Sequence, residues 1–297
     1  MLDAVGTDPD WAREGPLWPN REASRFVAAA GLDWHVQEMG AGPALLLLHG
    51  TAATTHSWAG LMPLLARHFR VIAPDLPGHG FTSAPPAARL SLDGMAGDVA
   101  TLLDRLGIAP EVVIGHSAGA AILVRQALDG RVRPRSIIAL NGALLPFGGI
   151  GGVLFPALAR LLFVNPLAAS IVAWRARDRA TVERLIVGTG SRIDATGLDI
   201  YARLFTSKRH AGAALAMMAN WDLDRLKREL PRLAVPLELV VASGDIAIPP
   251  QCAFDVARLA PKARVTYLRG LGHLAHEEDA EQVARVVLTL AGVDGAG

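Results

Sequence analysis

This chain of 297 residues has little cysteine and almost no net charge. Cys252 is the only cysteine, which excludes an intrachain disulfide framework and suits a reducing compartment. No nucleophile motif surrounds Cys252, so we interpret it as a small apolar residue and not as a catalytic thiol. The formal net charge is +1, which gives no general argument for nucleic-acid binding, and we expect no nucleic-acid partner.

Two kinds of segment are also lacking. Residues 1–20 contain acidic residues and two tryptophans but no basic start followed by an apolar run, so we expect no signal peptide and a cytoplasmic protein. The stretch from Gly142 to Trp174 is apolar apart from Arg160, but prolines and glycines interrupt it repeatedly. We therefore expect an apolar lid over a pocket, or a surface that contacts a membrane peripherally, and not a transmembrane helix.

What the chain has is material for a large core, because 51% of its residues are hydrophobic. Short apolar runs alternate with helical patterns, such as 92–106, which starts after Ser91 and ends at Gly107, and 118–128, which ends at Gly130. This alternation predicts an α/β fold with a mostly parallel eight-stranded sheet and helices on both faces. The expected strands are 25–30, 34–39, 44–48, 70–73, 111–114, 136–140, 237–242 and 264–268.

One segment breaks this alternation. Residues 144–231 contain helical patterns but no convincing strand, so we expect a helical lid or cap inserted between two strands. The organisation would then be an N-terminal extension (1–24), a first part of the core (25–143), the insertion (144–231) and a second part of the core (232–297). Up to Asn220 the insertion has an excess of five positive charges. This excess suits either a solvated face or attraction for an acidic ligand or an anionic membrane.

The pentapeptide Gly115-His116-Ser117-Ala118-Gly119 follows a buried strand and precedes a helix. A nucleophilic serine must be held clear of the backbone, and a sharp strand-to-helix turn flanked by glycines does this. The amino end of the helix then directs its partial positive charge toward the reacting oxygen. We predict that Ser117 is a catalytic nucleophile.

A serine hydroxyl needs a base, and His273 is the best candidate because it follows the last expected strand. His276 is the rival. The spacing His273-x-x-His276 also resembles a pair of metal ligands, but no third ligand accompanies it, so we expect no metal.

The imidazole in turn needs a carboxylate to orient it. Asp245 lies just past the strand 237–242, which places it at the carboxyl edge of the sheet. Asp222 and Asp224 are weaker candidates because they lie in a charged helical run.

An oxyanion requires two donors. We assign one to the backbone N–H of Ala118 and the other to that of Thr51, in the His49-Gly50-Thr51 turn after the strand 44–48. Ala52 remains an alternative to Thr51.

The order serine, aspartate, histidine, with His49-Gly50 and Asp75-Leu-Pro-Gly-His-Gly80 before the serine, resembles the α/β-hydrolase superfamily from about Arg25 to Leu290. The resemblance implies a helical cap in the place of the insertion. It identifies the fold far more firmly than the reaction. Dehalogenases and epoxide hydrolases of the superfamily carry aspartate as nucleophile, so Ser117 disfavours those activities.

A closer resemblance rests on Trp18-Pro-Asn-Arg21, Ser24-Arg-Phe26, Trp34-His-Val-Gln37 and the run from Leu45 to Ala52 followed by His56-Ser-Trp58. These segments look like the hydrolase-like family of bacteriochlorophyll gene clusters, the magnesium-chelatase accessory or small-subunit proteins. The resemblance implies a role around magnesium insertion into protoporphyrin, with chelatase subunits as partners. The chain has no Gly-x-x-x-x-Gly-Lys-Ser/Thr loop, so it is not the ATP-driven motor of a chelatase.

A tetrapyrrole is flat and apolar with acidic side groups, so it would suit an apolar lid with a basic excess. We expect no resident cofactor, because a tetrapyrrole would be a substrate or ligand. Plain helix packing is the alternative role for Met217, Met218 and Trp221. The residues expected to line the substrate pocket are Trp58, His116, Met217, Met218 and Trp221.

Two functions follow: a serine hydrolase acting on an ester or similar acyl bond of an apolar substrate, or a non-catalytic tetrapyrrole-binding or chelatase-accessory protein.

Overall fold

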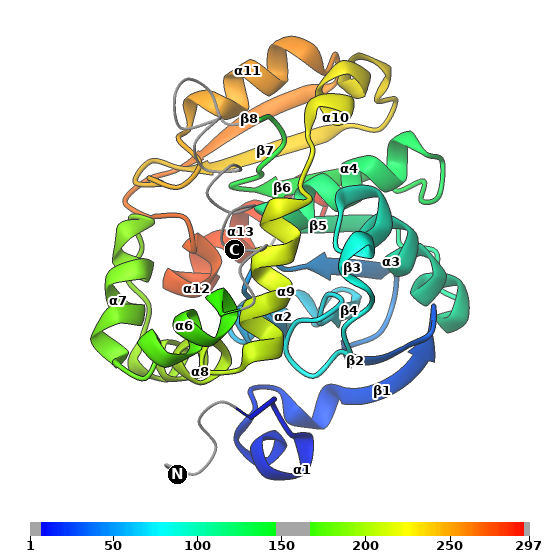
Figure 1. The fold of residues 1–297 in the computed structure, drawn as a ribbon. Helices are drawn as coiled ribbons and strands as arrows, with labels where there is room; N and C mark the ends of the chain where they lie inside the picture. Colours follow the sequence, from blue (N-terminus) through cyan, green and yellow to red (C-terminus); the bar gives the residue numbers. More distant parts are fainter. Residues whose placement is uncertain (1–6, 147–166, 294–297) are drawn as a thin grey trace.

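The computed structural model describes residues 7–146 and 167–293, and its centre is one eight-stranded sheet (Figure 1). The strand order is β1-β2-β4-β3-β5-β6-β7-β8; β2 pairs antiparallel with β1 and β4, and every other pairing is parallel. The strands are β1 (Ser24–Ala29), β2 (Leu32–Met39), β3 (Ala44–Leu48), β4 (Arg70–Pro74), β5 (Val112–His116), β6 (Ser136–Leu140), β7 (Leu237–Ala242) and β8 (Ala263–Leu268). The predicted fold class and all eight predicted strands are confirmed.

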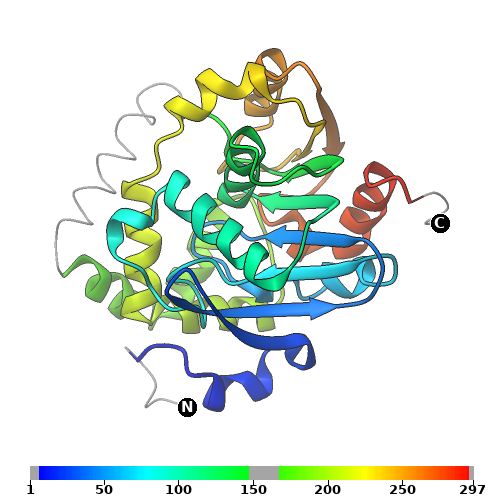
Figure 2. The same ribbon diagram turned by 90° about the vertical axis from the view of Figure 1, so that its right-hand side faces the viewer.

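Helices cover both faces of the sheet, as Figure 2 shows with α13 on one side and α3 and α4 on the other. The helices α3 (Leu92–Leu106), α4 (Ala118–Leu128) and α11 (Gln251–Leu259) share a hydrophobic core with one face, which includes Leu46 and Val113. The helices α2 (Leu61–Leu65) and α13 (Ala280–Leu290) pack on the other face, which includes Leu45 and Ile114. Alternation along each strand therefore fills two separate cores.

The bounds of α3 follow from its caps. The Ser91 side chain accepts a hydrogen bond from the N–H of Gly94, and Gly107 ends the helix in the left-handed conformation at φ +65°. Shorter elements complete the core: α1 (Trp11–Glu14), η1 (Gly15–Leu17), η2 (Arg21–Ala23), η3 (Thr55–Trp58), η4 (Ala87–Arg89) and α12 (Ala275–Glu278).

Between β6 and β7 the described residues form helices and no strand, as predicted. They are α6 (Ala168–Arg175), α7 (Arg179–Gly188), α8 (Ala195–Phe205), α9 (Lys208–Ala219), α10 (Asp224–Glu229) and the 3-10 turn η5 (Leu230–Arg232). The N-terminal segment ties down this group of helices, because Arg203 of α8 pairs with Glu14 at 2.6 Å and Arg209 of α9 pairs with Asp8 at 3.4 Å.

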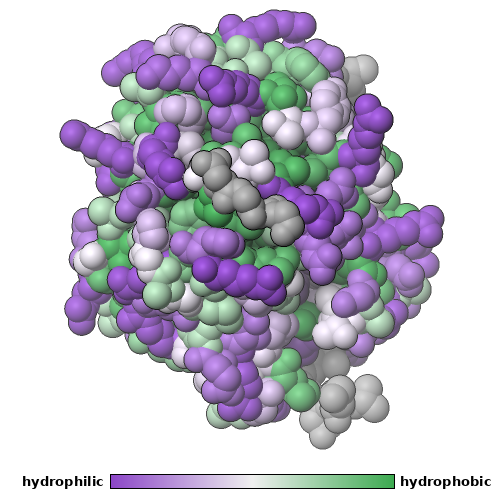
Figure 3. Space-filling model, turned by 180° about the vertical axis from the view of Figure 1, so that it is seen from behind, coloured by the Kyte–Doolittle hydropathy of each residue, from purple (hydrophilic) through white to green (hydrophobic). Residues whose placement is uncertain are grey.

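Most of the apolar stretch singled out above, residues 147–166, lies outside the described residues. Among the helices that the structure describes, none combines the length and the apolar character that a membrane crossing requires. Seen from behind, hydrophilic side chains are interspersed among hydrophobic ones over the surface (Figure 3).

Candidate active site

Ser117 occupies the tight turn between β5 and α4. Its backbone has φ +51° and ψ −117°, a conformation that L-residues rarely adopt. Two hydrogen bonds hold the turn: the Ser117 N–H donates to the carbonyl of Leu140 at 3.0 Å, and the N–H of Ala143 donates to the Ser117 carbonyl at 3.1 Å. The side chain is half-buried, so a substrate can reach it. The strained turn and partial exposure match the geometry expected for a nucleophile.

The two flanking glycines are required by close packing. A Cβ on Gly115 would lie 2.4 Å from the backbone nitrogen of Ala120, and a Cβ on Gly119 would lie 2.2 Å from the carbonyl oxygen of Leu48. Both contacts are with backbone, so neither can be relieved by a side-chain rotation. The glycines thus let β3, β5 and α4 approach closely enough to form the turn.

Asp245 and His273 meet at the same edge of the sheet, after β7 and β8. Asp245 Oδ2 lies 2.8 Å from His273 Nδ1, and both residues are buried. Asp245 Oδ1 accepts a second hydrogen bond from the N–H of Ile248 at 2.8 Å. Both carboxylate oxygens are therefore engaged, which fixes the plane of the imidazole. The part of the chain that the structure describes shows no hydrogen bond between His273 and the Ser117 hydroxyl, a contact that often tightens only when substrate binds.

The rival histidine has a different environment. His276 is buried in α12, where its Nε2 lies 2.8 Å from the Ser57 hydroxyl and its ring packs 4.5 Å from the ring of Trp58. This geometry favours His273 over His276 as the base. Across residues 7–146 and 167–293, no group of three or more His, Cys, Asp or Glu side chains is placed to hold a metal ion.

Asn141, which was not among the predicted site residues, follows β6 and holds the histidine loop in place. Its Nδ2 donates to the carbonyls of His273 at 2.9 Å and Gly272 at 3.1 Å, and its Oδ1 accepts from the N–H of Ala242 at 2.8 Å. Asn141 has φ +46°, a value that asparagine tolerates better than most residues. A polar residue directly after a predicted buried strand was the available signal for it.

The two predicted oxyanion donors lie on adjoining segments. A Cβ on Gly50 would lie 3.1 Å from Ser117 Cβ, so the turn containing Thr51 packs directly against the serine. In the described chain, the backbone N–H groups of Thr51 and Ala118 donate to no protein acceptor. Ala118 begins α4, where the first N–H groups of a helix have no partner within it. Both groups are therefore free to bind an oxyanion.

The five predicted pocket residues do not gather at one place. Met217 of α9 reaches the turn that contains Thr51, because its sulfur accepts a hydrogen bond from the Thr51 hydroxyl at 3.4 Å. Trp58 is fully buried in the core beneath α2 and α13, and Trp221 packs against the core on the opposite face. No contact of the half-buried Met218 places it at the site. Core packing explains the fully buried Trp58, whereas the partly buried Trp221 stays a predicted pocket residue.

The prediction that His116 lines the pocket was also wrong. The ring is buried beneath the site, 4.7 Å from the ring of His273, and its Nε2 lies 2.9 Å from the His273 carbonyl oxygen. Burial holds its pKa well below the usual value, so the ring is neutral and donates through Nε2. His116 thus supports His273 from below.

A buried carboxyl lies four residues past His273. Glu277 Oε1 accepts hydrogen bonds from the Ser57 hydroxyl at 2.5 Å and the Tyr201 hydroxyl at 2.8 Å. Burial raises the pKa of Glu277 to about 7. Because Tyr201 belongs to α8, this carboxyl connects the helices between β6 and β7 to the core.

The Asp75-to-Gly80 segment supports the site from the side. Asp75 Oδ2 lies 2.9 Å from His35 Nδ1, and Asp75 Oδ1 accepts from the N–H of Thr55 at 2.7 Å. Burial alone would raise the pKa of Asp75. The charge of His35 and the hydrogen bonds that the Asp75 carboxylate accepts outweigh burial and hold this pKa below its usual range. The Asp75 carboxylate thereby joins the middle of β2, the end of β4 and the start of η3.

Comparison with known proteins agrees with this geometry. A family model described as "Alpha/beta hydrolase family" matches residues 45–286, which spans the serine turn, Asp245 and His273. The chain belongs to the α/β-hydrolase family.

Its relatives differ in what their names say. The chain is 41% identical over 273 residues to the magnesium-chelatase 30 kDa subunit of Rhodobacter capsulatus, covering 91% of this chain and 95% of that protein. It is 28% identical to 2-hydroxymuconate semialdehyde hydrolase of Pseudomonas sp. (strain CF600), covering 90% and 93%. The predicted resemblance to magnesium-chelatase accessory proteins is thus confirmed.

Among solved structures, the epoxide hydrolase CorEH superposes with a TM-score of 0.79 at 22% identity, covering 91% of this chain and 98% of that one. At this identity the likeness concerns the fold alone.

Proposed function

We propose that this α/β-hydrolase is a serine hydrolase that cleaves an ester or a similar acyl bond of an apolar substrate. The single observation that carries the proposal is the 2.8 Å contact between Asp245 and His273 at the sheet edge where the strained Ser117 turn also lies. A carboxylate that orients an imidazole at the sheet edge of a half-exposed serine is the arrangement that activates a serine nucleophile. Ser117 is the half-exposed hydroxyl at that edge.

In the proposed reaction the Ser117 hydroxyl attacks the acyl carbon while its proton passes to His273 Nε2. Asp245 holds the imidazole in the required tautomer and stabilises the imidazolium. The backbone N–H groups of Thr51 and Ala118 bind the negatively charged oxygen of the tetrahedral intermediate. His273 then protonates the leaving group. Water, deprotonated by His273, attacks the acyl-enzyme and releases the acid and free Ser117.

The helical insertion, about residues 144–231, serves in this proposal as a lid. Met217 supports this role, since it is an apolar side chain of the insertion that touches Thr51 of the oxyanion turn. Methionine adapts to irregular apolar shapes, so it suits a large hydrophobic acyl or leaving group.

A fluorophosphonate probe tests the hydrolase proposal directly. We expect covalent labelling of the wild-type protein at Ser117, mapped by mass spectrometry, and loss of labelling in Ser117→Ala. Ser170→Ala, a half-buried serine on α6, is the matched control and should label normally. Undiminished labelling of Ser117→Ala would refute the proposed nucleophile.

The likeness to the Rhodobacter capsulatus chelatase subunit favours a second candidate function. In that version the protein binds a tetrapyrrole, or the chelatase subunits, as an accessory factor of bacteriochlorophyll synthesis around magnesium insertion. The two candidates are compatible if the apolar substrate is itself a tetrapyrrole ester.

Titration with protoporphyrin and with its magnesium form, followed by tryptophan fluorescence, separates the candidates. An accessory role predicts saturable quenching at micromolar ligand that is equal in wild type and Ser117→Ala. It also predicts that Ser117→Ala restores pigment synthesis in a strain lacking the protein. No quenching at micromolar ligand contradicts tetrapyrrole binding, and failure of Ser117→Ala to restore pigment favours the enzymatic role.

A further inference from the structure

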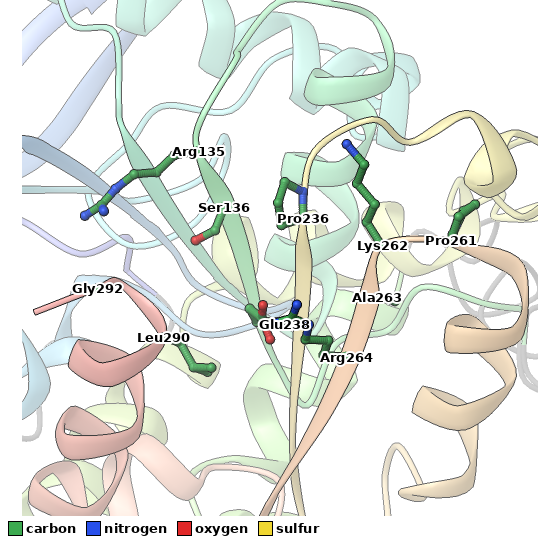
Figure 4. Close-up of a pocket in the computed structure, with 10 residues that line it drawn as sticks. All are labelled: Arg135, Ser136, Pro236, Glu238, Pro261, Lys262, Ala263, Arg264, Leu290 and Gly292. Atoms are coloured by element: carbon green, nitrogen blue, oxygen red, sulfur yellow. The ribbon is translucent and has the colours of Figure 1, made fainter.

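A polar cavity lies at the opposite edge of the sheet from Ser117. Its volume is about 490 Å³, and it opens at the amino ends of β6, β7 and β8 (Figure 4). Ser117 follows the carboxyl end of β5, which runs parallel to β6, so the two sites are separated by the length of the strands. None of the proposed hydrolase chemistry uses this cavity.

The floor of the cavity is polar because α13 does not cover this edge. Ser136 and Glu238 lie on the sheet face that also carries Ile138 and Val240, which pack against α13. The helix ends at Leu290 and the chain turns at Gly292, where φ is +68°. Among the described residues, the sheet face beyond that turn carries the polar side chains of Ser136 and Glu238.

Two polar atoms in this floor need a partner. Ser136 is 8% exposed and Glu238 is 7% exposed, yet Ser136 Oγ and Glu238 Oε2 have no hydrogen-bond partner among the residues the structure describes. Buried polar groups almost always have a partner, because leaving one unsatisfied costs the free energy of its lost hydration. Burial also raises the pKa of Glu238, although Arg264 opposes the shift.

Three cations surround the floor. Arg264 lies directly opposite Glu238 in the β7–β8 register. Arg135 donates from Nη2 to the carbonyl of Ala291 at 2.6 Å, and Lys262 donates from Nζ to the carbonyl of Ala234 at 2.8 Å. Each of these two hydrogen bonds uses one donor of its side chain. Arginine has five N–H donors and lysine has three, so further donors remain for a ligand.

We infer that this cavity, the amino-edge site formed by Arg135, Ser136, Glu238, Lys262 and Arg264, binds a small α-hydroxy- or α-amino-carboxylate. The carboxylate would accept hydrogen bonds from the arginines and the Ser136 hydroxyl. The adjacent hydroxyl or ammonium group would donate to Glu238 Oε2. A simple carboxylate would satisfy only half of this set and would leave the Glu238 oxygen facing a second anion.

L-malate and succinate form a matched pair of probes, since they differ by the one hydroxyl that Glu238 should accept. Isothermal titration calorimetry of the full chain should give saturable binding of L-malate and binding of succinate weaker by about tenfold, the effect of one hydrogen bond to a charged group. Glu238→Leu should abolish the preference for malate. Arg264→Gln should weaken both ligands by about tenfold or more, while Arg269→Gln, at the other end of β8, should change neither.

Circular dichroism and thermal unfolding establish that each variant is folded, and Ser136→Ala provides a smaller change if Glu238→Leu unfolds. Ser136→Ala is then expected to weaken both ligands. The inference is overturned if L-malate shows no saturable binding up to about 10 mM. Equal affinity for malate and succinate in wild type, or unchanged affinity in both Arg264→Gln and Ser136→Ala, would overturn it as well.

Discussion

His116 donates from Nε2 to the backbone carbonyl of His273 at 2.9 Å, so the residue before the nucleophile holds the residue proposed as its base. Asn141 donates to the same carbonyl from the end of β6. One carbonyl oxygen thus receives hydrogen bonds from two buried side chains on neighbouring strands. The position of His273 relative to Ser117 is therefore fixed through the sheet itself and not only through the contact with Asp245.

Asn141→Asp tests this support. The aspartate keeps the size of the side chain and tolerates φ +46°, but the oxygen that replaces Nδ2 faces the carbonyls of Gly272 and His273, to which asparagine donates. We expect kcat for an ester substrate to fall by about 10²-fold with little change in KM, because a displacement of about 1 Å at a catalytic group has an effect of that size. Steady-state kinetics, with thermal unfolding to confirm a folded protein, provide the measurement. Unchanged kcat would show that Asn141 has no positioning role.

Asp245→Asn should leave the fold intact and remove the orienting charge. The asparagine can still contact His273 Nδ1 but favours the wrong imidazole tautomer. We expect kcat to fall by about 10³–10⁴-fold, by analogy with the same change in other Ser-His-Asp enzymes. As a control, Asp222→Asn alters one of the exposed rival aspartates and should leave kcat unchanged. If Asp222→Asn lowered kcat and Asp245→Asn did not, Asp245 would not be the residue that orients the imidazole.

Glu277 should make stability depend on pH. Its pKa is raised from 4.5 to about 7 in the folded protein, so the folded state holds a proton that the unfolded state loses earlier. The stability that protonated Glu277 contributes is fully present below pH 4.5 and is lost as the pH rises through about 7. The neighbouring His276 has its pKa lowered to about 3 by burial and acts in the opposite sense, losing stability as the pH falls below 6.5.

Glu277→Gln removes only the first of these two effects. We expect the unfolding free energy of the variant to rise more steeply with pH between 5 and 7 than that of wild type, because Glu277 no longer opposes the stabilising effect of the buried neutral histidines; urea unfolding at several pH values measures this. Glu281→Gln, an exposed position in the first turn of α13, should retain the wild-type slope. Identical slopes in wild type and Glu277→Gln would contradict the assignment.

Gly119→Ala should disrupt the serine turn. The added Cβ would lie 2.2 Å from the backbone oxygen of Leu48, so β3 and α4 must move apart. We expect destabilisation of about 3 kcal/mol or failure to fold. Gly188→Ala is the matched control, since its Cβ would meet nothing within 4 Å. Chemical denaturation compares the two, and equal stability of both variants would show that the turn is not tightly packed.

The sequence predicted the fold well because its signals are local. β3, β6 and β7 are buried on both faces, so each is a short, mostly apolar segment bounded by turn residues, and their limits were predicted to the residue. The limits of α3 followed from Ser91 and Gly107 in the same way. The sheet order was not predicted, because the exchange of β3 and β4 along the sheet depends on non-local pairing.

The site was predictable only in part, for a similar reason. Ser117, Asp245 and His273 could be placed because each follows a strand at a recognisable turn. The role of Asn141 depends on hydrogen bonds to two other segments, and the raised pKa of Glu277 depends on burial, so a local pattern can mark these residues as polar but cannot reveal what they do. Trp58 and His116 were assigned to the pocket from their neighbours in sequence, whereas their side chains point into the core.

The most direct test of the account is the rate at which a fluorophosphonate labels Ser117 in wild type and in His273→Ala. If His273 activates Ser117, its removal should slow labelling by at least about 10²-fold, the usual contribution of a general base. His68→Ala, an exposed histidine outside the site, should label at the wild-type rate. Equal labelling rates in wild type and folded His273→Ala would contradict the proposed activation of Ser117.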